Sequence, residues 1–389
     1  MSTQISVGSS SSRDAAEAAR EAVRTALTGA VEPVFALVLS TAGYDAHALT
    51  AAVSEQLGEV PWAGCTTAGV FAGTEMLSLG LVVGVVSGSG VRFGIGVADR
   101  VSVDGRAAGV AATTQALAEL PAVVPPGWNR ACIVLADVLS GKAADVVRGA
   151  VQVGGTGVAW AGGGAGDDLR LARGAQFAQG KAWVDGAVVI ALDTRSRMAV
   201  GTRHGFRPYG PPSMVTRVKG ASISELEFEP AFSVYQRAAA GRGDQVSQDE
   251  FVNFAMSHPL GIPQAGGDHV IRDPMRVDAA GTLHCVGEVP DGCLVRVMEG
   301  ERAGLLFAAR EASRAAKQAV NGPLGGAIVF DCVSRSLVLG EGVQAEIETF
   351  SAELGAPVIG CLTFGEIGAI GPGVPQFHNK TAVVLALGA

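Results

Sequence analysis

One short pattern of glycine, cysteine and threonine recurs in this chain, each time behind the same succession of elements. The stretches Gly64-Cys-Thr-Thr-Ala-Gly69 and Gly360-Cys-Leu-Thr-Phe-Gly365 share the order G-C-x-T-x-G, and Gly162-Gly-Gly-Ala-Gly-Asp-Asp168 is a looser version without the thiol. An apolar run, a helix-like segment and a second apolar run precede each copy. The sequence therefore predicts strand, helix, strand and glycine turn, three times over.

The repeated unit indicates the fold class. Apolar runs without polar alternation are typical of strands buried on both faces, and their alternation with helices is typical of βαβ units. The first strands are expected at 34–39, 131–136 and 327–330, the helices at 45–57, 142–151 and 343–354, and the closing strands at 79–86, 187–192 and 381–387. We predict an α/β protein with repeated βαβ modules that form two mixed-sheet domains with covering helices.

The sequence pattern changes between the second and third repeats. A Gly/Pro-rich stretch at 201–212 interrupts the pattern, and short strands typical of antiparallel pairing follow between 269 and 298. A chain of 389 residues also exceeds the usual size of one core. We place the boundary near 215–222, which gives domains at 1–220 and 221–389.

Composition excludes several classes of function. The formal net charge is −8 and the sequence has no run of basic residues, so neither nucleic acid nor a membrane surface is an expected partner. The longest uncharged stretch, 149–166, holds eight glycines and is not a spanning helix. The first residues lack a basic region followed by an apolar core, which favours a cytoplasmic location. The six cysteines form no C-x-x-C pair, which argues against a zinc ribbon, and disulfides are not expected.

Together these motifs resemble the FIST family, named for F-box and intracellular signal transduction proteins. The resemblance also includes His204-Gly-Phe-Arg-Pro208, Phe330-Asp-Cys-Val-Ser-Arg335 and Phe377-His-Asn-Lys-Thr381. It implies a sensory protein that binds a small ligand and works with kinases, cyclic-dinucleotide enzymes or chemotaxis receptors. It also implies nitric oxide as a ligand in some members, which are haem proteins. Val70 departs from the family, which often has an acid there.

The expected ligand site lies at the strand ends, where glycine turns leave backbone N–H groups free. Asp167 and Asp168 could bind an amine or a cation, or cap a turn, and Arg272 could clamp a carboxylate. His378 could contact the ligand or make a structural hydrogen bond. The full set of candidate ligand-binding residues is Cys65, Thr66, Thr67, Gly69, Asp167, Asp168, Arg272, Cys361, Thr363, Gly365, Glu366 and His378. The alternative is that the glycines only make turns.

We predict a non-enzymatic sensor that signals to a separate partner, such as a histidine kinase or a cyclic-dinucleotide enzyme. One alternative is a sensor with haem b, for which His204 is the candidate axial ligand because Phe206 and Tyr209 could form an apolar wall beside the haem. A second alternative is a thiol-dependent hydrolase or transferase that uses Cys65 or Cys361. Both thiols are also compatible with core packing.

Overall fold

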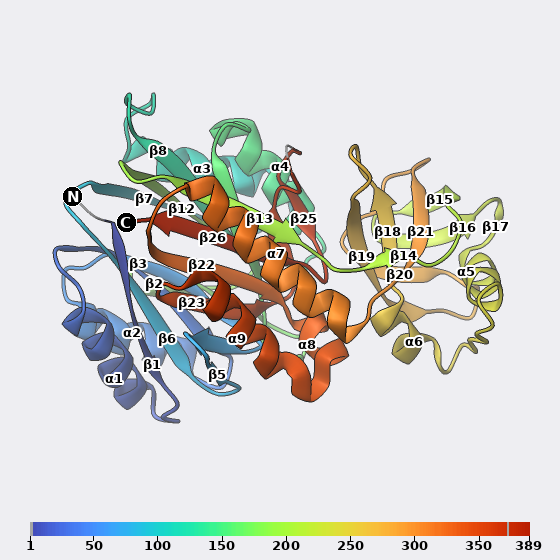
Figure 1. Cartoon of the computed structure of the whole chain (residues 1–389), viewed down its shortest axis with the longest axis horizontal. Helices are drawn as coiled ribbons and strands as arrows, with labels where there is room; N and C mark the ends of the chain where they lie inside the picture. Colours follow the sequence, from blue (N-terminus) through green and yellow to red (C-terminus); the bar gives the residue numbers. More distant parts are fainter. Residues whose placement is uncertain (1–2, 372) are drawn as a thin grey trace.

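The computed structural model describes residues 3–371 and 373–389. It contains a large body of three six-stranded sheets and a smaller β-rich part at one end (Figure 1). The two chain termini lie at the opposite end of the body. The α/β fold with repeated modules and covering helices is confirmed, and the segments 34–39 and 327–330 are strands.

The three sheets of the body share one strand order. The first runs β1 (Gln4–Ser10), β6 (Leu81–Ser87), β2 (Pro33–Thr41), β3 (Trp62–Thr67), β10 (Gln176–Ala178) and β11 (Lys181–Trp183). The second runs β7 (Val91–Ala98), β12 (Ala187–Thr194), β8 (Asn129–Asp137), β9 (Ala159–Ala165), β24 (Glu366–Gly368) and β25 (Gln376–His378). The third runs β13 (Met198–Arg203), β26 (Ala382–Gly388), β22 (Leu324–Cys332), β23 (Val358–Thr363), β4 (Val70–Ala72) and β5 (Glu75–Leu77).

The hairpin at the edge of each sheet comes from a different module. After β3 the chain leaves its own sheet, and β4 pairs with β23 of the third sheet. The hairpin after β9 pairs with β3 of the first sheet, and the hairpin after β23 pairs with β9 of the second. The only parallel pairs inside the modules of the described chain are β2–β3, β8–β9 and β22–β23. This cyclic exchange joins the three modules into one body.

Two helices cover the outer face of each sheet (Figure 1). They are α1 (Ala15–Thr28) and α2 (Ala46–Leu57) on the first, α3 (Gly105–Ala118) and α4 (Ala143–Gly154) on the second, and α7 (Arg302–Val320) and α9 (Val343–Leu354) on the third. Aspartates begin three of them: the side chains of Asp14, Asp45 and Asp104 accept hydrogen bonds from backbone N–H groups three residues on. The inner faces of all three sheets share one central core, which includes Leu37, Ile133 and Phe330.

The β-rich part is inserted into the third module, between β13 and α7. Its strands are β14 (Arg207–Pro208), β15 (Ser213–Lys219), β16 (Ser222–Leu226), β17 (Glu229–Pro230), β18 (Leu260–Pro263), β19 (His269–Val277), β20 (Leu283–Val286) and β21 (Leu294–Glu299). The sheet closes into a barrel because β21 pairs with both β15 and β18. The helices α5 (Ala231–Ala240) and α6 (Phe251–Ser257) complete its separate core. The boundary expected near 215–222 lies inside the barrel, where this range covers most of β15 and the turn into β16.

The first glycine of each repeat lies inside a strand and does not make a turn, which corrects the sequence-based expectation. Gly64, Gly162 and Gly360 lie inside β3, β9 and β23. A Cβ at Gly64 would lie 1.6 Å from the carbonyl oxygen of Val38, and one at Gly360 would lie 2.1 Å from the ring of Phe71. The glycines therefore allow neighbouring chain segments to approach the strand closely. None of the helices in the described part of the chain is both long and apolar enough to cross a membrane.

Candidate functional site

A cavity of about 520 Å³ lies between the three-sheet body and the barrel. The body supplies residues after β8, β9 and β23, together with the end of β22 and the short helix α8 (Val333–Leu339). The barrel supplies residues of β19 and β20. The cavity thus lies beyond the carboxyl ends of two parallel strand pairs, where ligands of α/β proteins usually bind.

Apolar side chains make most of the cavity wall, and one polar group of residues interrupts it. Asp273 of β19 is buried, Ser334 Oγ donates to its Oδ2 over 2.7 Å, and Lys380 Nζ lies 3.0 Å from the same oxygen. Asn379 also lines the cavity, and its buried Oδ1 has no hydrogen-bond partner among the described residues. The thiol of Cys332, at the end of β22, borders the cavity as well, and burial raises its pKa well above the ordinary value.

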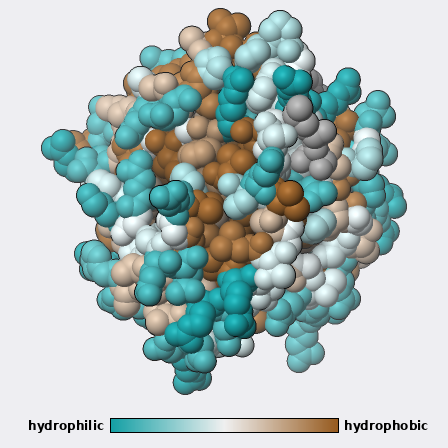
Figure 2. Space-filling model, turned by 90° about the vertical axis from the view of Figure 1, so that its left-hand side faces the viewer, coloured by the Kyte–Doolittle hydropathy of each residue, from teal (hydrophilic) through white to brown (hydrophobic). Residues whose placement is uncertain are grey.

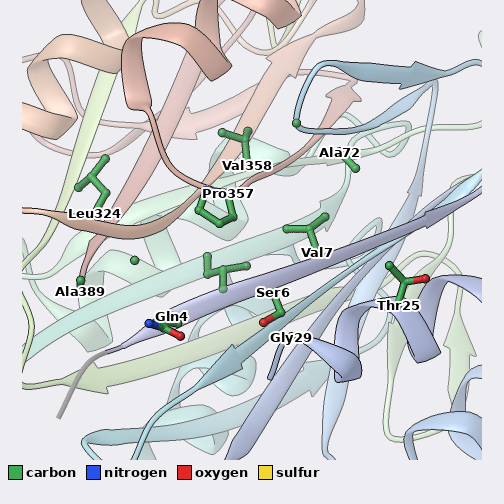
Figure 3. Close-up of a pocket in the computed structure, with 13 residues that line it drawn as sticks. Gln4, Ser6, Val7, Thr25, Gly29, Ala72, Leu324, Pro357, Val358 and Ala389 are labelled. Carbon is green, nitrogen blue, oxygen red and sulfur yellow. The ribbon is translucent and has the colours of Figure 1, made fainter. Parts of the chain in front are cut away.

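A second hollow, of about 640 Å³, opens near the termini (Figure 3). Gln4 and Ser6 of β1 face Leu324 and Pro357 across it, at the amino ends of β22 and β23. Its lining has no charged side chain. Figure 2 shows apolar surface gathered in the middle of this end of the molecule, ringed by hydrophilic residues. Because the cavity at the barrel combines apolar walls with buried polar groups, it is the stronger candidate for a ligand site.

The structure places the thiols of Cys65 and Cys361 in the central core. Both side chains are fully buried among residues of the three sheets. Burial raises the pKa of Cys65 to about 12 and raises that of Cys361 well above its ordinary value. Neither thiol can form the thiolate that a nucleophile requires at neutral pH.

The hydroxyls expected in the ligand site are used within the fold. Thr66 Oγ1 accepts from the N–H of Ala175 over 2.9 Å, and Thr67 Oγ1 donates to the carbonyl of Gly69 over 2.9 Å. Gly69 itself is buried. These residues join β3 to neighbouring segments and do not line the cavity at the barrel.

Glu366, a candidate ligand-binding residue, is fully buried, and its carboxylate contacts neutral donors. Its carboxylate accepts from Thr363 Oγ1 over 2.7 Å and from the N–H of Thr381 over 3.0 Å. Burial raises its pKa to about 8 despite these hydrogen bonds. Gly365, just before it, has φ of 111° and makes the turn that sequence reasoning expected.

Asp167 organises the loop at 167–173 behind β9. Its carboxylate accepts hydrogen bonds from the N–H groups of Leu171, Ala172 and Arg173, at 2.9, 2.6 and 2.7 Å. Asp168 Oδ1 accepts from the N–H of Ala42 over 3.3 Å, and partial burial raises the pKa of Asp168. Both carboxylates therefore hold chain segments in place, which matches the turn-capping alternative and leaves no open pair for a cation.

Arg272 and His378 connect the barrel with the body. Arg272 Nη1 donates to the carbonyl of Phe377 over 3.1 Å, and its Nε donates to that of Glu288 over 2.6 Å. Its guanidinium is therefore not free to clamp a carboxylate. His378 Nε2 donates to the carbonyl of Gly368 over 3.0 Å, and burial lowers the pKa of this ring to about 4.

His204 does not fit the role of a haem ligand. Its side chain is buried where the chain enters the barrel. Its Nε2 lies 2.9 Å from Asp268 Oδ1, and its Nδ1 accepts from the N–H of Phe206 over 2.9 Å. Both ring nitrogens thus have protein partners, and Phe206 and Tyr209 pack into two different cores. No group of His, Cys, Asp and Glu is placed to hold a metal ion in residues 3–371 and 373–389.

Sequence reasoning missed the polar groups that lie closest to the cavity. Asp273 precedes a proline in a segment with the pattern of an ordinary edge strand. Lys380 lies two residues after His378, in a motif whose candidate ligand-binding residue was the histidine. Arg335, also fully buried, pairs with Asp331 over 2.9 Å and with Glu346. The signal available in the sequence was three charged residues within or beside apolar segments, at 331, 346 and 380.

Comparison with known proteins adds the family. A family model of the FIST N domain matches residues 34–229, and one of the FIST C domain matches residues 231–369. The chain belongs to the FIST family. FIST domains are sensory domains, so a sensory role follows from membership.

Two relatives from Mycobacterium tuberculosis, the uncharacterized proteins MT0656 and Rv0628c, are each 26% identical over 97% of this FIST chain and 98% of their own length. A solved cyanuric acid hydrolase from A. caulinodans matches 50% of this chain and 72% of its own with 13% identity. The TM-score of that match is 0.28, which is too low to support an argument about fold or activity.

Proposed function

We propose that this FIST protein is a non-enzymatic cytoplasmic sensor that binds a small ligand in the cavity between body and barrel. In this proposal a separate partner, such as a histidine kinase or a cyclic-dinucleotide enzyme, receives the signal. The observation that supports it is the position of the cavity: its walls come from both parts of the molecule. A ligand there contacts both at once.

The connection between the two parts explains how binding would be passed on. The chain enters the barrel at 204–206 and returns at 300–301, and the two crossings lie together, since a Cβ at Gly205 would lie 2.5 Å from the carbonyl oxygen of Gly304. A ligand that binds one arrangement of barrel and body more tightly than another shifts the population toward that arrangement. The changed outer surface is then what the partner recognises.

The thiols support binding over catalysis. Burial raises the pKa of Cys65, Cys361 and Cys332 alike, so each is held as a neutral thiol. Cys332 is the one of these that lines the cavity, and within the described residues its thiol makes no hydrogen bond to an imidazole that could act as a base.

A variant that fills the cavity tests the proposal. Leu337, on α8, borders the cavity, so Leu337→Arg places a charged chain across it. We expect compounds from a metabolite panel to raise the Tm of the wild-type protein, and Leu337→Arg to abolish that increase. Val123→Arg is the matched control, since Val123 is 80% exposed and does not border the cavity. A panel without a stabilising compound, or equal stabilisation of Leu337→Arg, would contradict the proposal.

A further inference from the structure

The rim of the barrel cavity has an unusual concentration of exposed apolar side chains. Scattered exposed leucines are normal, but a contiguous group marks a binding surface. Five large apolar side chains that are 38–56% exposed all border this one cavity: Leu139, Leu169, Leu171, Met275 and Leu337. They come from both the body and the barrel. Most of the surface that a ligand would contact is therefore apolar.

Two of these leucines are held in place by an unusual backbone. Leu169 and Leu171 have φ of 63° and 52°, in the left-handed region that branched side chains rarely adopt. The three hydrogen bonds to the carboxylate of Asp167 hold the loop in this conformation. Strain of this kind is retained where the surrounding structure enforces it, often at ligand sites. The loop at 167–173 thus presents both leucines on the cavity rim.

The polar end of the cavity offers free hydrogen-bonding groups. Asp273 is 3% exposed, and its Oδ2 is occupied by Ser334 and Lys380. Within the described part of the chain, its Oδ1 accepts no hydrogen bond. Asn379 is 2% exposed, and its amide oxygen Oδ1 has no hydrogen-bond partner among the described residues. Because buried polar groups normally have partners, a ligand is the natural source of the missing ones.

The charges at this end balance. The carboxylate of Asp273 is matched by the ammonium of Lys380 at 3.0 Å. Burial raises the pKa of the neighbouring Glu366 to about 8, so it is mainly protonated at neutral pH. A ligand carboxylate would meet Asp273, and a ligand ammonium would leave an excess positive charge in an apolar site. A neutral group that both donates and accepts satisfies Asp273 and Asn379 without either cost.

From the apolar rim and the two oxygens without partners, Asp273 Oδ1 and Asn379 Oδ1, we infer that the ligand is an uncharged amphiphile, with an aliphatic or aromatic body and one hydroxyl or amide group. This inference rests on the proposed function, since it names the ligand class of the same cavity. The apolar body lies between the leucines of the rim. Its hydroxyl or amide donates to Asp273 Oδ1 and hydrogen bonds to the amide of Asn379.

The test uses the full-length protein and the neutral dye Nile red, whose fluorescence increases in an apolar cavity. Four competitors with one chain length are compared at neutral pH: 1-octanol, octanamide, octanoate and octylamine. We expect octanol and octanamide to displace the dye at concentrations at least about tenfold lower than the two charged compounds, because a charged head group loses more hydration. This comparison needs no variant and is independent of any folding defect.

Asn379→Leu gives a second measurement. The substitution removes the amide and keeps a similar volume, so octanol should bind about fivefold more weakly while Nile red binding is retained. Tighter binding of octanoate, through Arg276 at the exposed rim for example, or of octylamine would overturn the ligand class. If that binding is lost in Leu337→Arg, the proposed function still stands. Equal Nile red binding by wild type and Leu337→Arg would overturn both.

Discussion

At the scale of single residues, the body contains a buried cluster of charged side chains that contributes to stability. The sequence pattern did not reveal that these side chains meet. Arg335 is fully buried, and its guanidinium also donates to the carbonyls of His204 and Leu305, at 2.7 and 3.0 Å. It therefore joins α8, the entrance of the barrel and the start of α7. Its partners Asp331 and Glu346 are equally buried, and burial raises the pKa of Asp331 well above its ordinary value.

Loss of this cation should be severe. Arg335→Met keeps the length of the side chain but leaves two buried carboxyl groups without their counter-charge, which should cost roughly 3–5 kcal/mol of unfolding free energy. Arg314→Met is the matched control: Arg314 is 48% exposed and pairs with Glu353 on the surface, so its loss should cost about 1 kcal/mol or less. Urea denaturation measures both. Equal unfolding free energies for the two variants would show that the buried cluster does not need Arg335.

Glu366 should make stability depend on pH. Burial raises its pKa from 4.5 to about 8, so the folded protein keeps a proton that the unfolded chain releases between these values. The raised pKa of Glu366 therefore contributes fully to the free energy of unfolding below pH 4.5. This contribution, on the order of a few kcal/mol, is lost as the pH rises toward 8. Glu366→Gln, which cannot ionise, should remove this part of the decrease.

The measurement compares urea midpoints at about pH 5 and about pH 8 for wild type, Glu366→Gln and Glu119→Gln. Glu119 is exposed and serves as the surface control, so its variant should follow the wild-type slope. If Glu366→Gln loses as much stability as wild type between these two pH values, Glu366 must already be ionised in the folded protein at the lower pH.

At the scale of elements, the long periodic segments were predictable and the short exchanged ones were not. The helices at 45–57, 142–151 and 343–354 and the strands from 34, 131 and 327 were expected because apolar periodicity reports burial directly. The hairpins β4–β5, β10–β11 and β24–β25 have strands of three residues, too short to show alternation. Their partners lie in other modules, and pairing between distant segments leaves no local trace in a sequence.

The structure separates the strand ends that were expected to carry the ligand site from most of the residues that were named for it. Strand ends of the body do border the cavity, through Leu139, Leu169 and Phe364. The thiols of the repeated motif instead lie in the central core, and its hydroxyls make hydrogen bonds within the fold, because β3 and β23 continue through the glycines. A shift of one residue along a strand moves a side chain to the opposite face, so a misplaced strand end misassigns every residue around it.

At the scale of the whole molecule, the body and the barrel have separate hydrophobic cores and are joined by a limited set of contacts. The hairpin exchange holds the three modules together without any strand of the barrel. Contacts between the two parts include a small apolar cluster with Phe206, Ile271 and Leu305 and the hydrogen bond of Arg272 to Phe377. They also include the contacts of Asp273 with Ser334 and Lys380, and the ion pair of Arg148 with Glu288. The body should therefore fold without the barrel, whereas the cavity should not form.

Replacement of residues 207–299 by a short Gly-Ser linker tests this. The linker is feasible because the chain crossings near Gly205 and Gly304 are in contact. We expect circular dichroism of a mixed α/β fold and cooperative unfolding, with a lower Tm because Ile271 and Met298 no longer cover Leu305. Nile red binding should be lost, because β19 and β20 supply one wall. An unfolded product would show that the barrel is part of the folding unit, and undiminished dye binding would place the ligand site entirely in the body.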